Sequence, residues 1–371
     1  MEFVLTVFCV IILMMKFPVI WFCAAFLIFS VFAKGFIKPE KKPRGPKSSV
    51  TVQASKKTVP IKEPDEVIEI RTFMSYYPDL EYDVFYDDES GDWQINISAN
   101  VFLNREEKSD SEKALKRSAS FYWAGGRMLP KDQLAKKDEY WVLQYPYNNV
   151  LRDPKSYDEE ELAKIREMAS AENRKSDGGT PMFFFDFIYS AQSRLVIEEH
   201  IVRTRFLGKL TKVHERIFPA LKRVEAEICR AAALPVESLS SAEKIAKIDT
   251  KSESLTADQK EIREFIMSLR SCDAYYWREI AGTKRKSFHS YGIAIDILPR
   301  RLGGRSIYWG WEKERSGENW MLVPLKSRWM PPETVIRIFE KEGFIWGGFW
   351  TIFDNMHFEY HPELIGSLQE D

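Results

Sequence analysis

The chain has 371 residues, room for two or three domains, and its aromatic content of 14% favours a folded protein over a disordered one. Its 54 Lys and Arg residues nearly balance its 55 Asp and Glu residues, so the formal net charge is −1. A nucleic-acid-binding protein needs a basic surface to neutralise phosphates, and this composition gives no support for that class.

Residues 3–33 form an apolar segment in which Lys16 is the main interruption. If translation starts at the methionines just before Lys16, this lysine is the basic start of a signal peptide, residues 17–33 are its apolar core, and a cut follows Ala33. The alternative is an uncleaved membrane anchor, because residues 17–33 are just long enough to span a bilayer. Both interpretations of residues 1–33 remain open, and either allows membrane association through this segment.

Residues 34–62 carry nine Lys or Arg residues and one acid, which indicates a solvated basic linker. Directly after an anchor, this positive segment would favour a cytoplasmic location for the rest of the chain. We nevertheless expect an extracytoplasmic protein, periplasmic or in the cell envelope, because of the chemistry described below.

Residues 63–195 are expected to form a β-rich N-terminal domain of unknown role. The alternating aromatic residues of 82–97 surround Asp-Glu-Ser-Gly-Asp and predict a hairpin. Residues 121–126 and 140–147 are further strand candidates, and the charged stretch 157–175 is predicted to be helical. The clustered aromatic residues suit a small β core or stacking on sugars.

Residues 196–255 are expected to form a helical connecting region. Apolar residues from 197 to 228 recur at spacings of mostly three and four, which predicts one helical face, with a kink or break at Pro219. His200 and His214 on this stretch are interpreted as structural residues. Cys229 and the later Cys272 are either two buried thiols or a disulfide, and both alternatives stay open.

Residues 256–371 are expected to form the domain that carries the chemistry. A helix is predicted over 256–270, and Thr256 and Gln259 fit a capping box at its start. A second helix is predicted to have Pro332 at its first position and Gly343 at its C-terminal cap. Val335, Ile336 and Phe339 are expected to face a core, and Trp346 and Trp350 to line a cleft or pack in the core.

Two short stretches of this domain predict a metal site. In "SFHSYGIAID", residues 287–296, alternation places Asp296 on the strand face opposite the isoleucines, and Gly292 allows a bend that brings His289 back towards it. In "DNMHFE", residues 354–359, His357 lies on a second strand. If these strands are neighbours, two imidazoles and one carboxylate converge, a donor set that suits Zn²⁺ and leaves a fourth position for water.

Asp354 lies three residues before His357, at the start of that strand. A metal-activated water needs a base to take its proton, and Asp354 is placed for this role. The alternative is that Asp354 is a fourth metal ligand.

These two stretches resemble the M15 zinc peptidases, the D-alanyl-D-alanine carboxypeptidases and L-alanyl-D-glutamate endopeptidases. The family pattern S-x-H-x-x-G-x-A-x-D, followed by D-x-x-H-F-E, is met at every fixed position, and the resemblance covers roughly residues 265–366. It implies an α+β fold of the hedgehog and D-alanyl-D-alanine peptidase type, with a small antiparallel sheet and flanking helices.

The resemblance also implies roles for individual residues. His289, Asp296 and His357 would hold one Zn²⁺ per chain, and Asp354 would be the general base. Ser287 would hold substrate or shape the ligand loop, and Glu359 would orient a ligand histidine. The family uses an arginine upstream of the first stretch to hold substrate. Arg278 is the candidate for it, although it lies closer to His289 than the family spacing suggests, and Arg285 is its rival.

The expected function is therefore hydrolysis of an amide bond in peptidoglycan stem peptides by an exported zinc peptidase. The alternative is a wall-binding or signalling module of the same fold that has kept zinc but lost turnover. A binding module has no need of a base at Asp354, which favours the enzyme.

Overall fold

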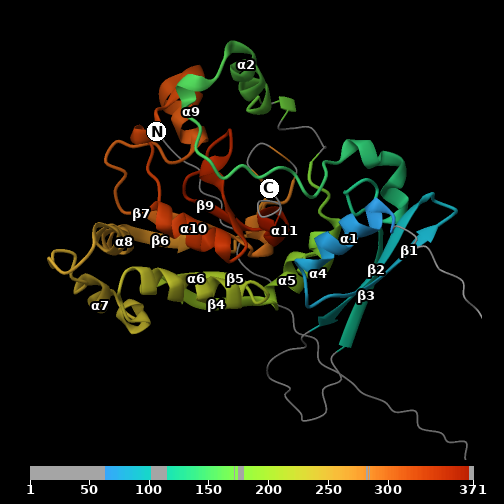
Figure 1. Ribbon diagram of the computed structural model, residues 1–371, viewed down its shortest axis with the longest axis horizontal. Coiled ribbons are helices and arrows are strands. Elements are labelled where there is room, and N and C mark those ends of the chain that lie inside the picture. The colour runs from blue at the N-terminus through green and yellow to red at the C-terminus, as the bar shows by residue number, and fades with distance from the viewer. Residues whose placement is uncertain are drawn as a thin grey trace, which may run out of the picture. The chain divides into compact units, whose positions relative to one another are not determined.

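In the computed structural model, the described residues belong to the unit Ile61–Asp371. The predicted leader and linker, residues 1–62, lie outside the described residues. Helices and small antiparallel sheets alternate along the chain, so the fold is α+β as predicted (Figure 1). The described residues are 63–101, 115–170, 172–173, 179–280, 283 and 285–366.

The N-terminal part pairs one helix with a three-stranded sheet. Helix α1 (Asp65–Ser75) precedes strands β1 (Glu81–Asp87), β2 (Asp92–Val101) and β3 (Leu115–Tyr122), which lie in the order β1-β2-β3. The pairing of β1 with β2 confirms the hairpin predicted over 82–97.

Two strand predictions in this part need correction. Of residues 121–126, only the first two belong to β3, and the chain turns directly after them. Residues 140–147 form no strand: Tyr140 makes an isolated bridge with Gly179, and Leu143 and Tyr147 instead bury their side chains from an irregular segment. The apolar run reflects burial, which periodicity alone does not distinguish from a strand.

Short helices connect this part to the next. Helix α2 (Glu159–Met168) lies within the predicted stretch 157–175 and begins with a capping box between Asp158 and Glu161. The others are η1 (Lys131–Glu139), η2 (Pro154–Ser156), α4 (Phe183–Ile188) and α5 (Arg194–Glu198).

The continuous helical face predicted from residue 197 to 228 is wrong. Strands β4 (Ile201–Phe206) and β5 (Lys209–His214) form an antiparallel hairpin there. Its two-residue turn has positive φ at both Leu207 (46°) and Gly208 (74°), the geometry that joins twisted strands. Leu210, placed on the core face by the helical pattern, is 72% exposed.

Helix α6 (Phe218–Ala231) follows the hairpin, and Pro219 lies in its first turn, where the missing N–H costs no hydrogen bond. Pro219 therefore starts a helix and does not kink one. Next come η3 (Val236–Leu239) and α7 (Ala242–Ala246).

A four-stranded antiparallel sheet organises the C-terminal part. Its order is β6 (Leu269–Asp273), β7 (Ala294–Pro299), β9 (His357–Tyr360) and β8 (Phe344–Trp346). Sequence-distant β7 and β9 are thus neighbours, as the metal-site hypothesis requires.

Two predicted helices border this sheet (Figure 1). Helix α8 (Ala257–Ser268) has the predicted capping box of Thr256 and Gln259. Helix α10 (Glu333–Lys341) begins one residue later than predicted, so Pro332 is its N-cap. The remaining elements are η4 (Phe288–Tyr291), α9 (Trp309–Ser316), η5 (Gly317–Leu322), η6 (Leu325–Ser327), η7 (Gly347–Phe349) and α11 (Pro362–Ile365).

One apolar core runs through the N-terminal and C-terminal parts. On α10, Val335, Ile336 and Phe339 are buried as predicted, and Phe339 stacks on Phe358 of β9 with ring centroids 4.0 Å apart. On the N-terminal side, Phe185 of α4 makes an edge contact with Phe288, next to His289. The segment before residue 196 therefore packs directly against the loop that carries the first motif.

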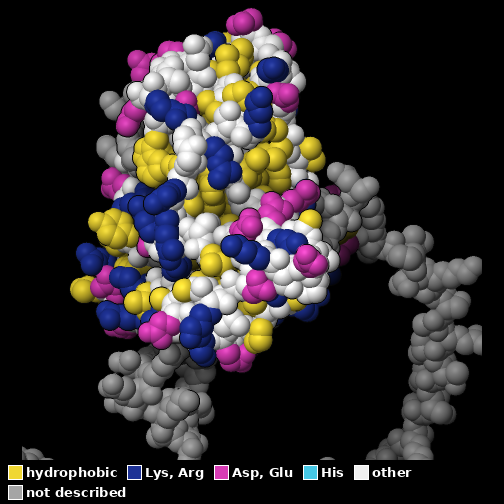
Figure 2. All heavy atoms as spheres, turned by 90° about the vertical axis from the view of Figure 1, so that its left-hand side faces the viewer, with side chains coloured by type: hydrophobic (Ala, Val, Ile, Leu, Met, Phe, Trp, Pro, Cys, Tyr) yellow, Lys and Arg dark blue, Asp and Glu magenta, His cyan; other side chains and the backbone are white. Residues whose placement is uncertain are grey.

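Cys229 and Cys272 are both buried free thiols. Of the two alternatives that the sequence left open, the structure therefore has two thiols and no disulfide between these residues. Among the residues that the structure describes, no helix has the length and apolar character needed to cross a bilayer. The face drawn in Figure 2 mixes basic and acidic side chains with apolar ones between them, in keeping with the near-zero net charge.

Candidate metal centre

Strand pairing brings Asp296 and His357 together. Asp296 of β7 is the direct register partner of His357 at the start of β9. Directly opposite residues of an antiparallel pair have their side chains on the same face, about 5 Å apart at Cβ. The sheet thus places a carboxylate and an imidazole at one point, although 60 residues separate them in the chain.

A short helical turn presents His289 to the same point. Ser287 caps the turn η4, and its hydroxyl accepts a hydrogen bond from the His289 N–H at 3.3 Å. Gly292 ends the turn with φ +66°, and a Cβ there would lie 2.8 Å from the backbone nitrogen of His214. Glycine is thus required both for the left-handed turn and for the close approach of β5. Ser287 is placed to shape this loop, one of its two expected roles.

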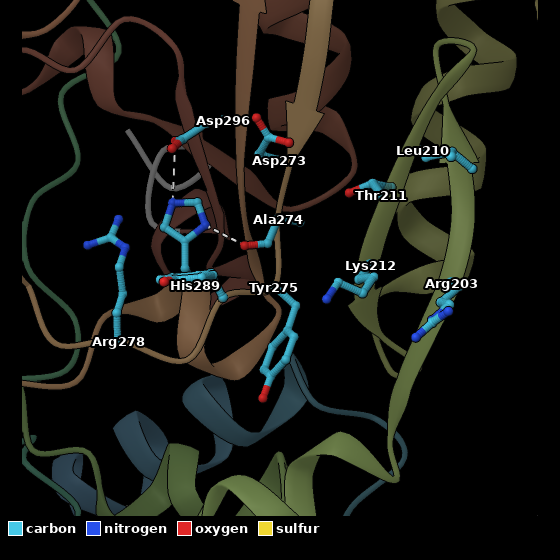
Figure 3. Close-up of a pocket in the computed structure, with 11 residues that line it drawn as sticks. Arg203, Leu210, Thr211, Lys212, Asp273, Ala274, Tyr275, Arg278, His289 and Asp296 are labelled. Atoms are coloured by element: carbon cyan, nitrogen blue, oxygen red, sulfur yellow. Dashed lines mark hydrogen bonds and ion pairs between the residues drawn. The ribbon is translucent and has the colours of Figure 1, made fainter. Parts of the chain in front are cut away.

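The His289 ring has a defined orientation. Its Nδ1–H donates to the carbonyl of Ala274 at 2.6 Å, and its Nε2 lies 3.3 Å from Oδ1 of Asp296 (Figure 3). This Nε2 is buried and makes no hydrogen bond with any described residue. A buried nitrogen lone pair that faces a carboxylate oxygen is unfavourable without a cation between them, and this arrangement is natural in a metal ligand.

His357 lies between two carboxylates. Its Nδ1 is 2.8 Å from Oδ1 of Asp296, and its Nε2 is 2.8 Å from Oε1 of Glu359. Burial lowers the pKa of His357, but the hydrogen bonds to Asp296 and Glu359 outweigh it and raise this pKa well above its usual value. Burial raises the pKa of Asp296, but the charge of His289, at 3.3 Å, and the hydrogen bond and charge of His357 outweigh it and hold this pKa below its usual range.

The three side chains fit a zinc ion. Each side chain offers one ligand atom, and these atoms of His289, Asp296 and His357 all lie within 4.8 Å of one another. Among the described residues, no other group of three His, Cys, Asp or Glu side chains comes this close together. Tetrahedral zinc with bonds of 2.0–2.1 Å separates its ligand atoms by about 3.3 Å. The measured separations of 3.3 Å and 2.8 Å are close to this value. With Glu359 accepting the Nε2–H, His357 would offer Nδ1 to the metal.

Asp354 faces the same centre from the loop before β9. Its Oδ1 is buried and accepts no hydrogen bond from any described residue. Burial raises the pKa of Asp354; the charge of His357 lowers it, and Asp296 and Glu359 raise it, to about 7. A carboxylate with a pKa near neutral can both take and release a proton at physiological pH.

The two candidate arginines lie in different places. Arg278 is exposed and lines the cleft beside His289 (Figure 3). Arg285 lies over the ring of Trp141, with its guanidinium carbon 5.4 Å from the ring centre. Of the two, Arg278 is therefore the arginine that lines the cleft beside the metal centre, despite its short spacing to His289.

The two candidate tryptophans also differ. Trp346 is fully buried and donates from Nε1 to the carbonyl of Asn355 at 2.9 Å, so it is a core residue. Trp350 is half-buried, with its ring centre 5.5 Å from that of His357. Of the two, Trp350 lies next to the metal centre.

A chain of buried polar groups continues from His357 and was not predicted. Glu359 Oε2 lies 3.4 Å from Nε2 of His361, whose Nδ1 lies 2.8 Å from Oε1 of Glu363. Oε2 of Glu363 accepts a hydrogen bond of 2.7 Å from the hydroxyl of Tyr77, just after α1. The sequence did contain a signal, because His and Glu alternate at every second position from 357 to 363.

The cleft beside the metal centre has a volume of about 650 Å³. One wall comes from the β4–β5 hairpin, which sequence reasoning missed because it predicted a helix there. Figure 3 shows the hairpin residues across the cleft from His289. Its lining residues are Arg203, Leu210, Thr211, Lys212, Asp273, Ala274, Tyr275, Tyr276, Arg278, His289 and Asp296.

Comparison with known proteins gives one match. No curated protein and no solved structure matches the chain. Residues 281–360 match a family model described as D-alanyl-D-alanine carboxypeptidase, and this segment contains all three clustered ligands and Asp354. This match supports the resemblance to the M15 peptidases that the sequence pattern gave, over this segment of the chain.

Proposed function

We propose that the protein is a zinc-dependent peptidase that hydrolyses one amide bond of a peptidoglycan stem peptide, as a carboxypeptidase or an endopeptidase. The observation that carries the proposal is the convergence of His289 Nε2, Asp296 Oδ1 and His357 Nδ1 beside the buried carboxylate of Asp354, whose Oδ1 accepts no hydrogen bond from any described residue. Family similarity over residues 281–360 supports the reaction class.

His289, Asp296 and His357 would hold the zinc ion. When bound, zinc supplies Lewis acidity, which polarises a scissile carbonyl and acidifies a water molecule. Ala274 and Glu359 keep the two imidazoles in the orientation that leaves one nitrogen of each towards Asp296.

Asp354 would move the proton. Its carboxylate would take a proton from the attacking water and then give it to the leaving amine, a role that suits a buried carboxylate beside the metal ligands. Arg278 would hold the substrate and steady negative charge from the exposed rim of the cleft. A non-catalytic binding module would gain nothing from a buried carboxylate oxygen without a hydrogen bond at this position, since such an atom costs stability.

Peptidoglycan lies outside the inner membrane, so the proposed substrate implies export or anchoring through residues 3–33. We propose that the mature chain begins at Lys34, after a cut that follows Ala33. N-terminal sequencing of the protein from envelope fractions tests this point. Retention of residues 14–33 would establish an anchor, and recovery from the cytoplasm alone would contradict the proposed substrate.

The reaction itself is tested with purified muropeptides and mass spectrometry. We expect one defined amide bond to be cut, cleavage to stop with a chelator, and activity to return with added zinc. The mass of the products distinguishes loss of a terminal D-alanine from an internal cut. A protein with bound zinc that leaves all muropeptides intact would contradict the proposed activity.

A further inference from the structure

The β4–β5 hairpin is a fixed wall of the cleft and lies outside the segment that matches the peptidase family. Two backbone hydrogen bonds attach β5 to the metal-site loops: Tyr275 N–H donates to the carbonyl of Lys212 at 2.7 Å, and His214 N–H donates to that of Gly292 at 2.9 Å. The backbone of this wall therefore has a defined position relative to His289.

Two cations face each other on this wall. Arg203 and Lys212 are direct register partners across the hairpin, and both are exposed. Like charges directly opposite each other destabilise a strand pair, so the arrangement needs a compensating reason. Neither side chain has an ion-pair partner among the described residues.

The acids nearby are largely engaged elsewhere. Glu198 already pairs with Arg194 at 2.8 Å and accepts a hydrogen bond of 3.2 Å from the hydroxyl of Tyr275. The hydrogen bond from Arg194 is the main cause that lowers the pKa of Glu198, and the charge of Lys212 adds a small contribution. Asp296 is engaged with the two metal-site histidines. Among the cleft-lining residues, Asp273 is then the one carboxylate left to balance three cations.

The cations lie on two sides of the metal centre. Arg278 is beside His289 on one side, and Arg203 and Lys212 are on the hairpin side (Figure 3). The Lys212 ammonium lies 5.7 Å from the ring centre of Tyr275, which extends this wall towards His289. A substrate that crosses the metal centre from Arg278 would thus reach Arg203 and Lys212.

We propose that Arg203 and Lys212 form a carboxylate-binding subsite that selects peptides with an acidic residue. Arg278 would hold a substrate group on one side of the scissile bond, and the acidic residue would lie on the other side. The inference rests on the proposed peptidase function, because it names the substrate class of the same cleft. A bound carboxylate lies between two like charges and removes their repulsion, which accounts for the cross-strand pair.

The test compares two synthetic peptides that differ in one group, a glutamate or a glutamine next to the scissile amide. The pair is made twice, once with this residue before the amide and once after it. Binding to the zinc-loaded full chain is measured by calorimetry, and kcat and KM are measured separately. We expect the wild type to prefer the glutamate peptide about tenfold at one of the two positions. The preference should appear mainly in Kd and KM.

Arg203→Gln with Lys212→Gln should abolish this preference and leave the glutamine peptide unaffected. The matched control is Arg205→Gln, which removes one charge from the same strand at a residue that does not line the cleft, and it should keep the preference. Equal binding of both peptides by the wild type, no binding of either, or a preference that survives the double substitution would overturn the subsite. Selective binding without cleavage would keep the subsite and contradict only the peptidase activity.

Discussion

The imidazole of His357 has one nitrogen directed to the candidate metal position and the other to Glu359. Burial raises the pKa of Glu359, but hydrogen bonds with His357 and His361 outweigh this effect and lower it to about 2. Glu359 is therefore ionised at neutral pH and accepts the Nε2–H of His357. It fixes which nitrogen of His357 is available for zinc.

This arrangement predicts a graded loss of zinc affinity along the buried polar chain. Glu359→Gln should weaken zinc binding about 10–100-fold, because it removes the charged partner of a ligand histidine. Tyr77→Phe, which acts only through Glu363, should have a smaller effect in the same direction. Competition with a chromophoric chelator measures both affinities.

The control for the change from acid to amide is Glu318→Gln, an exposed residue of η5. It should leave zinc affinity at the wild-type value. Wild-type affinity in Glu359→Gln would mean that Glu359 does not orient the ligand.

Individual residues of the site could be predicted because each has a short-range signature. Alternation placed Asp296 and His357 on strands, and the glycine after His289 marked the bend. Tyr77 had no such signature, since 285 residues separate it from Glu363 and only the fold brings them together. Arg278 and Arg285 could not be distinguished for the same reason.

At the scale of elements, the β4–β5 hairpin shows how a pattern can mislead. Spacings of three and four suited a helix, whereas the signal for the turn was the Leu-Gly pair that adopts positive φ. The hairpin was missed, and with it one whole wall of the cleft. By contrast, α8 and α10 were predicted closely, because a capping box and an amphipathic stripe are local features.

The end of this hairpin predicts a dependence of stability on pH. His214 accepts a hydrogen bond at Nδ1 from the Arg216 N–H, at 3.0 Å, and its Nε2 lies 3.1 Å from the carbonyl of Tyr189. The neutral ring satisfies both partners, and a second proton would face an N–H. Burial, with the nearby charges of His200 and Arg216, lowers the pKa of His214 to about 3.

The unfolded state binds a proton at His214 below its ordinary pKa of 6.5, and the folded state does so only near 3. The contribution to stability is therefore complete above pH 6.5 and is lost as the pH falls towards 3. With a chelator present to remove metal, the urea concentration at the midpoint of unfolding is measured at each pH. From pH 6.5 to pH 5 it should fall more steeply for the wild type than for His214→Gln. Parallel pH profiles would show that His214 is not the titrating group.

At the scale of the whole molecule, the N-terminal part packs directly against the segment that matches the peptidase family. Asp186 of α4 accepts hydrogen bonds from Lys286 at 2.5 Å and from the hydroxyl of Tyr291 at 2.6 Å, on either side of His289. The hydroxyl of Tyr147 donates to Glu340 and accepts from the N–H of Trp346. The β-rich segment thus supports both halves of the metal centre, in addition to any separate role.

The central claim is that the metal centre is catalytic and that Asp354 moves the proton. Asp354→Asn keeps the shape of the side chain but removes the base. Zinc content and muropeptide cleavage, measured on the same sample beside the wild type, therefore separate the possible roles of Asp354. We predict about one zinc per chain in both proteins and a fall in cleavage of about 10²–10⁴-fold in the variant. Loss of zinc together with activity would make Asp354 a ligand, and cleavage at near wild-type rate would contradict the mechanism.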